Sequence, residues 1–319
     1  MLPETLILVN PVAGGGAARR VLPAVASYLA QQNHRADFAE STSTTDLRAR
    51  AAQGAQRGYR SIIALGGDGT FHHLVDVTLG CSVQLGLFPA GHGNDLASSL
   101  GIPKDAIAAA GAFLRSRAHR FDVARVRFPG ADQATADGAC ADRLPAAVLV
   151  GAGGIGLDAE AAQLANTRFA RWPSAVRYIA GALQAFRRFA PVDVELELDG
   201  TTERGRALFV AVANAPYYGS GIRIAPTAKM DDGLLDVVMV GPLDWTRIVD
   251  AIPVLLRSGD IRWSEVRRFR ARHLRITASR PAMVHSAGEI VGATPIEIEV
   301  LPGAISIVVP DQNAPEGDK

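Results

Sequence analysis

Three glycine-rich segments carry the residues most able to do chemistry. They are NPVAGGG at 10–16, GGDGT at 66–70 and GHGND at 91–95. Backbone N–H groups in glycine turns, and the positive end of a following helix, bind anions such as phosphate. Asp68 and Asp95 add carboxylates, which approach a phosphate only through a divalent cation or a substrate hydroxyl. The segments therefore predict a phosphate-binding site, and the alternative is tight turns in which the aspartates cap helices.

The elements around these segments alternate in type. Apolar runs at 5–10, 61–67 and 84–91 predict buried strands, and a helical pattern follows each run. This alternation predicts an α/β domain with a doubly wound parallel sheet over residues 1–125. Ligands bind at the carboxyl ends of strands in such sheets, so we expect the three glycine segments to converge on one cleft.

Short strands separated by turn residues dominate the chain after residue 125. Runs such as VDVELELDG at 192–200 and IEIEVL at 296–301 alternate apolar and polar residues, as half-buried strands do. We therefore predict a β-sandwich domain over residues 126–319, with a β-barrel-like domain as the alternative. Its last apolar run, at 304–310, could return to the first domain.

Several segments of this second domain allow more than one interpretation. The basic, aromatic stretch 168–190 predicts a helix that packs on the sheet or also lies on an anionic membrane surface. The basic segment 262–276 raises the same question, although its end has the pattern of a strand. A flexible hairpin loop is expected at 129–145. GAGGIG at 151–156 matches a dinucleotide fingerprint without the required βαβ context, so glycine turns are favoured.

Composition limits the possible partners and location. The formal net charge of the 319 residues is +1, which gives no overall field for nucleic acid. No apolar stretch approaches the roughly 18 residues of a membrane span, and the first residues lack a signal-peptide pattern. Cys81 and Cys140 are expected to be reduced thiols. We expect a cytoplasmic protein that can lie peripherally at the inner face of the membrane; the sequence leaves its oligomeric state open.

Longer blocks resemble a known family. NPVAGGG, GGDGT, LGLFPAGHGNDLASSLGIP, FDVARV, NAPYYGSGIRIAPTAKMDDGLLDVVMV and the GE of SAGEIV occur in this order. They resemble the bacterial diacylglycerol-kinase-like lipid kinases, relatives of sphingosine and ceramide kinases, over nearly the whole chain. GGDGT is shared with NAD kinases, whereas the block at 224–238 distinguishes the two families.

The resemblance implies an ATP-dependent lipid kinase that uses Mg²⁺ and whose β-rich domain binds the lipid substrate. The residues that it would place around ATP are Asn10, Pro11, Val12, Ala13, Gly14, Thr42 (or Ser41), Gly66, Gly67, Asp68, Gly69, Thr70, Phe71, His72, His92, Gly93, Asn94 and Asp95.

Carboxylates carry the other roles that the resemblance implies. Glu289 matches the residue that accepts the proton of the lipid hydroxyl, with help from Asp68. The Asp232 carboxylate and the backbone carbonyls of Lys229 and Leu234 match a structural Mg²⁺ site. Asp68, Asp95 and Asp122 match aspartates of a magnesium-linked network.

The chain departs from the family pattern in its expected catalytic cleft. His72 and His73 replace an Asn-Glu pair, His92 replaces the Thr of GTGND, and Ala287 replaces the Asp of D-G-E. The three histidines are expected to titrate near neutrality, and His72 and His92 are expected to hydrogen-bond the nucleotide or line its pocket. A weakly active kinase is therefore favoured over a catalytically impaired nucleotide- or lipid-binding regulatory protein, and an NAD-kinase-type enzyme is less favoured still. Diacylglycerol, phosphatidylglycerol, a sphingoid base and a prenol all remain candidate acceptors.

Overall fold

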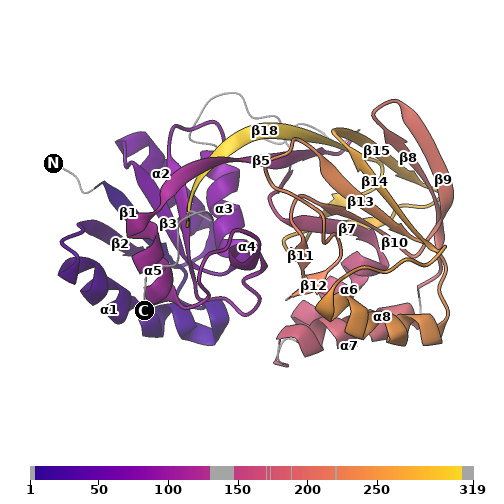
Figure 1. Cartoon of the computed structure of the whole chain (residues 1–319), viewed down its shortest axis with the longest axis horizontal. Helices are drawn as coiled ribbons and strands as arrows, with labels where there is room; N and C mark the ends of the chain where they lie inside the picture. The colour runs from indigo at the N-terminus through magenta and orange to yellow at the C-terminus, as the bar shows by residue number, and fades with distance from the viewer. Residues whose placement is uncertain are drawn as a thin grey trace. The chain divides into compact units, whose positions relative to one another are not determined.

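The computed structural model describes residues 4–129 and 147–310, apart from 170, 173, 188 and 220. Contacts divide the described chain into two compact units, residues 4–121 with 305–310 and residues 122–129 with 147–304. The first unit is an α/β domain and the second is rich in strands (Figure 1). The predicted combination of an α/β and a β-rich domain is thus confirmed. The hairpin loop predicted at 129–145 lies, except for residue 129, outside the described residues.

The sheet of the first unit is parallel at every pairing. Its strands, in spatial order, are β2 (Ala36–Glu40), β1 (Thr5–Val9), β3 (Ser61–Gly66), β4 (Gln84–Pro89) and the C-terminal part of β18 (Ile296–Val309). Every residue of β1 and β3 is buried, which is typical of a sheet covered by helices on both faces.

Five helices accompany this sheet. They are α1 (Ala13–Gln31), α2 (Thr44–Arg57), α3 (Asp68–Thr78), α4 (Asp95–Ser99) and α5 (Ala106–Arg115). The chain crosses from β1 to β2 in one direction and from β2 through β3 to β4 in the other, and right-handed crossovers place α1 and α2 on opposite faces. Accordingly α1 packs against α5, and α2 packs against α3. The sheet is therefore doubly wound.

Two antiparallel sheets form the second unit. The first contains the N-terminal part of β18, with β15 (His273–Ala278), β8 (Val192–Leu198) and β9 (Thr201–Ala207), and is joined by β5 (Arg117–Arg127) and β6 (Ala147–Leu149). The second contains, in spatial order, β14 (Val266–Ala271), β13 (Leu235–Val240), β10 (Phe209–Ala213), β7 (Ala152–Gly156), β16 (Met283–Ser286) and β17 (Glu289–Ala293). Leu196 and Ile276 of the first sheet share one buried core with Val210 and Val237 of the second, so the sheets form a sandwich.

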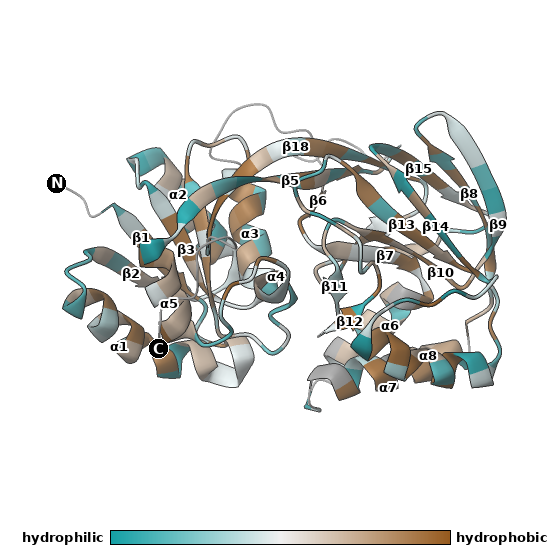
Figure 2. Ribbon diagram, viewed as in Figure 1, coloured by the Kyte–Doolittle hydropathy of each residue, from teal (hydrophilic) through white to brown (hydrophobic). Residues whose placement is uncertain are grey.

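Helices cover the outer face of the second sheet. Val210 and Val212 of β10 belong to the sandwich core, whereas Phe209 and Ala211 belong to a separate cluster outside it. That outer side carries α6 (Leu157–Thr167), α7 (Ser174–Phe186) and α8 (Trp245–Arg257), and near them lies a short hairpin of β11 (Tyr217–Tyr218) and β12 (Ile222–Arg223). Figure 2 shows hydrophobic residues along α7, α8 and the neighbouring strands.

Three local predictions need correction. The stretch 168–190 is not helical throughout: α6 ends before it, at Thr167, and α7 covers only Ser174–Phe186. The segment 262–276 forms strands β14 and β15, so its helical interpretation is wrong. Cys81 is in a disulfide bond, so it is not the reduced thiol that we expected. Within the described ranges, no helix is both long and apolar enough to cross a membrane.

Candidate functional site

The first glycine segment touches both of the others. Gly14, Gly15 and Gly16, in the first turn of α1, have positive φ angles of 59°, 62° and 87°. A Cβ on Gly14 would lie 2.1 Å from the carbonyl oxygen of Ala90, so only glycine allows this approach to the third segment. The side-chain amide of Asn10 donates a hydrogen bond to Oγ1 of Thr70 at 3.0 Å, which joins the first segment to the second.

The second and third segments are joined at two points. A Cβ on Gly91 would lie only 2.6 Å from Cα of Gly67, so the two backbones are in direct contact. The Asp68 carboxylate accepts hydrogen bonds from the backbone N–H groups of Asp95 and Leu96, both at 3.0 Å. The three segments therefore meet at the carboxyl ends of β1, β3 and β4, as the alternation of strands and helices predicts.

Asp68 is a buried carboxylate at the first position of α3 that caps the neighbouring helix α4. Its two oxygens each accept one backbone N–H group, from Asp95 and from Leu96, at the start of that helix. Burial raises the pKa of Asp68, and these backbone donors oppose that rise. Next to the cap, Asn94 has a φ of 53°, and its side-chain oxygen accepts the N–H of Gly91 at 3.0 Å. Asp68 thus fixes the shape of the GHGND turn.

The expected ATP-contacting residues differ in what they offer a ligand. Beside Gly69, in the first turn of α3, a Cβ would meet no atom within 4 Å. Phe71, by contrast, is fully buried, so its side chain belongs to the core and not to a ligand surface. Thr42 donates from both its N–H and its hydroxyl to Asp46 at the start of α2. Gly69 and the neighbouring backbone therefore provide the open surface at this edge of the sheet.

The three histidines do not form a metal centre. The ring centroids of His72 and His73 are 6.1 Å apart and the planes are inclined by 76°, so the side chains diverge. His92 is exposed on the third segment. No group of three or more His, Cys, Asp or Glu side chains that could hold a metal occurs in the part of the chain that the structure describes. Burial lowers the pKa of His72 to about 4, so the expectation that it titrates near neutrality is wrong.

Asp122 anchors the loop of the expected structural Mg²⁺ site. Its carboxylate accepts the N–H of Gly233 at 2.6 Å and the N–H of Gly303 at 2.7 Å. Its own N–H donates to the carbonyl of Met230 at 2.6 Å. Asp122 is buried, so these bonds fix the loop between β12 and β13.

Arg270 pairs with the Asp232 carboxylate, which the expected Mg²⁺ would need as a ligand. Its guanidinium forms a hydrogen-bonded ion pair with one oxygen of Asp232, and the N–H of Leu234 donates to the other oxygen at 3.1 Å. Nε of Arg270 also lies 3.4 Å from Oδ2 of the buried Asp236. A positive charge already neutralises this acidic pair, so the side-chain arrangement does not fit a divalent cation beside Lys229, Asp232 and Leu234.

Glu289 follows a tight turn between β16 and β17. Ser286 pairs with Glu289 across the turn, and the intervening Ala287 and Gly288 have φ angles of 51° and 83°. Two positive φ angles in a two-residue hairpin define a type I′ turn, which favours Asn-Gly or Asp-Gly. Glu289 itself is exposed. The aspartate of the family pattern at position 287 is therefore also the preferred turn residue, and alanine is a poor one.

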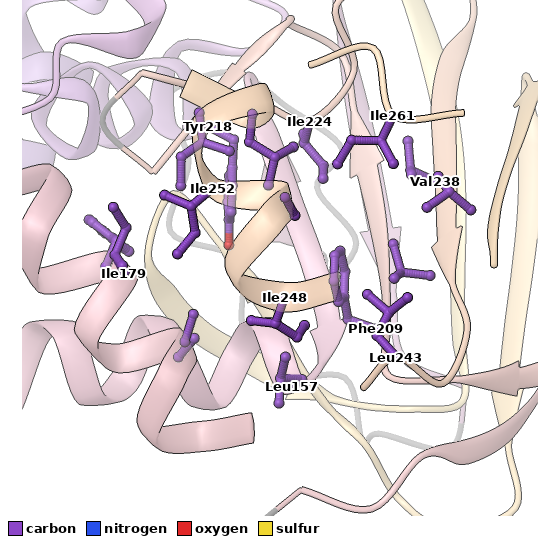
Figure 3. A pocket seen from close by; sticks show the side chains of 18 of the residues that line it. Leu157, Ile179, Phe209, Tyr218, Ile224, Val238, Leu243, Ile248, Ile252 and Ile261 are labelled. Atoms are coloured by element: carbon purple, nitrogen blue, oxygen red, sulfur yellow. The ribbon is translucent and has the colours of Figure 1, made fainter. Parts of the chain in front are cut away.

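An apolar pocket of about 150 Å³ lies between the outer face of the second sheet and helices α6, α7 and α8 (Figure 3). Of its lining residues, all except Tyr178, Tyr218, Trp263 and Arg268 carry hydrocarbon side chains. Phe209 and Val238 contribute from the sheet, and Ile248 and Ile252 contribute from α8. Such a lining suits a hydrocarbon chain.

Sequence reasoning missed two parts of this region. It did not predict α8, although Asp244 caps that helix and apolar residues recur at helical spacing from Trp245 to Leu256. It also gave His285 no partner, whereas Nε2 of His285 lies 2.7 Å from the hydroxyl of Tyr218. The cap and the apolar spacing could have predicted the helix. The contact of His285 joins residues 67 positions apart, and no sequence pattern indicates it.

Fold and site together define a two-domain class, in which an α/β domain with joined glycine segments precedes a β-sandwich. The sequence matches the diacylglycerol kinase catalytic domain over residues 4–126. It also matches the YegS C-terminal NAD kinase beta sandwich-like domain over residues 149–309. The chain therefore belongs to the family of diacylglycerol kinases and YegS-like lipid kinases, and this family membership supports a kinase function.

Individual relatives cover nearly the whole chain. A diacylglycerol kinase of Mycobacterium tuberculosis is 29% identical over 310 residues, which are 95% of this chain and 94% of the relative. A diacylglycerol kinase of Bacillus subtilis is 23% identical over 315 residues, 98% of each chain. A crystal structure of a diacylglycerol kinase from Bacillus anthracis matches with a TM-score of 0.72 at 21% identity, covering 96% of both chains, and it supports the fold.

Proposed function

We propose that the chain transfers the γ-phosphate of ATP to the hydroxyl of a lipid. The observation that carries the lipid part is the hydrocarbon-lined pocket of the sandwich domain. A soluble acceptor such as NAD would need polar groups throughout its site, and this lining offers few. The proposal therefore favours a lipid over the NAD-kinase alternative.

The three joined glycine segments would hold the nucleotide. The first backbone N–H groups of α3 have no partner within the helix and can donate to phosphate oxygens, and the space beside Gly69, where a Cβ would meet no atom within 4 Å, leaves room for them. Asp68 acts in this proposal as a positioning residue, since its carboxylate holds the turn that carries Gly93 and Asn94. Asp95 is the carboxylate that would hold Mg²⁺ with the phosphates, and Mg²⁺ would neutralise their developing charge.

Glu289 would accept the proton of the lipid hydroxyl. Its place at the start of β17, directly after the type I′ turn, leaves the side chain exposed. A carboxylate in such a place can act as a general base. Catalysis would otherwise consist of positioning and charge stabilisation, as is usual for phosphoryl transfer.

The lipid would reach the pocket from a membrane surface through α7 and α8. Trp245, Val249 and Leu256 of α8 are 44%, 45% and 42% exposed, although Ile248 and Ile252 of the same helix line the pocket. Together with Ile248 and Ile252 they form one apolar stripe at helical spacing, and this stripe extends beyond the pocket, so its exposed part suits an apolar medium outside. The surface formed by Trp172, Val176, Trp245, Val249 and Leu256 is called the α7–α8 surface below. Exposed Arg171, Arg187 and Arg257 accompany it and favour anionic lipid.

Transfer of radiolabelled γ-phosphate from ATP to separate lipids tests the proposal. The acceptors are diacylglycerol, phosphatidylglycerol, a sphingoid base and a prenol, with NAD as the soluble comparison and with Glu289→Gln as the inactive control. We expect Mg²⁺-dependent transfer to at least one lipid and none to NAD. Transfer to NAD alone would contradict the proposal.

A regulatory protein is the second candidate, because Ala287 removes a carboxylate that the family pattern has beside Glu289. It would bind ATP and lipid without transfer. Nucleotide binding measured on the same samples separates it from the kinase, since only a regulator binds ATP yet labels no acceptor.

A further inference from the structure

A buried polar pair adjoins the pocket: Tyr218 lines it, as do Tyr178, Trp263 and Arg268, and the partner of Tyr218 is the buried His285. The ring of Tyr218 forms part of the lining, and its hydroxyl lies 2.7 Å from Nε2 of His285 (Figure 3 shows the tyrosine). The two rings are also in contact, with centroids 5.5 Å apart and planes inclined by 36°. His285 is only 1% exposed. Buried polar groups are costly unless they are paired, and ligand sites of this kind use a few of them to fix orientation.

The hydroxyl of Tyr218 can serve a ligand and His285 together. A phenol has one proton to donate and two lone pairs that accept, so one such oxygen can take part in more than one hydrogen bond at the same time. Tyr218 sits on the short strand β11, and β11 contacts β7 of the sheet. The oxygen is therefore held in place by both its hairpin and its histidine partner.

His285 connects the pocket to the hairpin that carries Glu289. It lies on β16, where Val284 and His285 flank an irregularity in the pairing with β17. Ser286 follows and donates its hydroxyl proton to the carbonyl of Val148 at 3.0 Å, which fixes the strand just before the type I′ turn. The polar pair and the candidate proton acceptor thus belong to one hairpin.

We propose that Tyr218, held by His285, is the positioning residue that binds the oxygen-bearing end of a single hydrocarbon chain in this pocket. The inference rests on the proposed lipid kinase function and deepens it by assigning the direction in which the chain lies. About 150 Å³ is below the roughly 300 Å³ at which sites for drug-sized ligands begin, so one chain segment fits and two chains do not. The chain lies among the isoleucines and leucines of α8, and its polar end meets Tyr218.

Displacement of a bound fluorescent fatty acid, cis-parinaric acid, tests this orientation on the full chain. The competitors are 1-tetradecanol and 1-chlorotetradecane, which share a chain and differ in whether the end group forms hydrogen bonds. One neutral hydrogen bond changes affinity by about two- to tenfold, so we expect that preference for the alcohol in the wild type. Tyr218→Phe should abolish the preference while still binding the probe. Tyr178→Phe, which removes a hydroxyl elsewhere in the lining, should keep it.

Variants of His285 test the pair without changing Tyr218. His285→Leu removes the partner and should reduce the preference for the alcohol, whereas His285→Gln retains a polar partner and should preserve most of it. An equal preference in all of the proteins would overturn the positioning role alone. No displaceable binding of the probe by the wild type would overturn the lipid pocket of the proposed function, and this inference with it.

Discussion

The two candidate sites are built from different materials. In the α/β domain, glycine backbones meet at the ends of three parallel strands, and Asp68 holds the backbone N–H groups of Asp95 and Leu96. In the sandwich domain, side chains form the pocket, and the backbone is occupied by strand pairing and helices. The comparison suggests that an added side chain at the glycine site would block nucleotide binding. A changed side chain in the pocket would instead alter which lipid the pocket prefers.

The largest expected effect is the loss of nucleotide binding in Gly69→Leu. The Cβ of the new side chain would meet no atom within 4 Å, so we expect the fold to persist while the side chain excludes the phosphates. We expect at least about a hundredfold weaker ATP binding, or roughly 2.7 kcal/mol, by titration calorimetry. Gly69→Ala is the matched control and should lose far less. Gly67→Val is a poorer test, because its Cβ would lie 3.1 Å from Cα of Gly91 and push the loops apart.

Arg270→Met should destabilise the protein by about 2 kcal/mol, because it leaves Asp232 and the buried Asp236 without their cation. Thermal unfolding measures this loss. EDTA should leave the wild type unchanged, and added Mg²⁺ should restore part of the stability of the variant. A wild type that EDTA destabilises by several degrees would show instead that a divalent cation belongs at Asp232.

His72 should make stability depend on acid pH. Its folded-state pKa of about 4 lies below the ordinary value of 6.5, so the unfolded chain binds the proton more readily. Its contribution is complete above pH 6.5 and is lost as the pH falls toward 4, with a loss of about 1 kcal/mol near pH 5 after allowance for the exposed part of the ring. Denaturant unfolding at several pH values should show this slope for the wild type and a shallower one for His72→Asn.

The α7–α8 surface supplies the corresponding test for the sandwich domain. Trp245→Glu should reduce binding to vesicles that contain phosphatidylglycerol by about tenfold, since it replaces apolar area with charge. Sedimentation with vesicles measures the bound fraction. Phe38→Glu changes another exposed apolar residue, on β2 of the α/β domain, and should bind like the wild type. Equal loss in both variants would mean that the α7–α8 surface is not the contact.

The smallest expected effect concerns the turn before Glu289. Ala287→Asp, Ala287→Asn and Ala287→Gly should each stabilise the protein by about 0.5 to 1 kcal/mol, because each tolerates the φ of 51° better than alanine. Thermal unfolding measures the gain. If phosphate transfer also rises with Asp alone, the carboxylate contributes to catalysis. A rise with all three would mean that turn geometry is what the family aspartate provides.

The sequence predicts the secondary structure, but it does not predict contacts between residues that are far apart in the chain. The strands and helices around the glycine segments follow from hydrophobic periodicity, and the convergence of the segments follows from the parallel sheet. The burial of Phe71 and the low pKa of His72 depend on neighbours from other elements. The pairing of Arg270 with Asp232 depends on the register of β13 and β14, in which Asp236 faces Arg270. The spacing of residues in the sequence does not predict which residues of β13 and β14 pair with each other.

The long strand β18 has a consequence for the order in which the protein is made. Its residues Ile296 and Ile298 pair with β15, whereas Ser306 and Ile307 pair with β4, a strand encoded more than 200 positions earlier. The α/β sheet therefore lacks one edge partner while the ribosome completes the sandwich, and β4 waits with unpaired backbone groups. The α/β domain is thus synthesised first but completes its sheet only after the sandwich domain has been synthesised. A chaperone that shields the edge of β4 would act between the synthesis of β4 and the synthesis of β18.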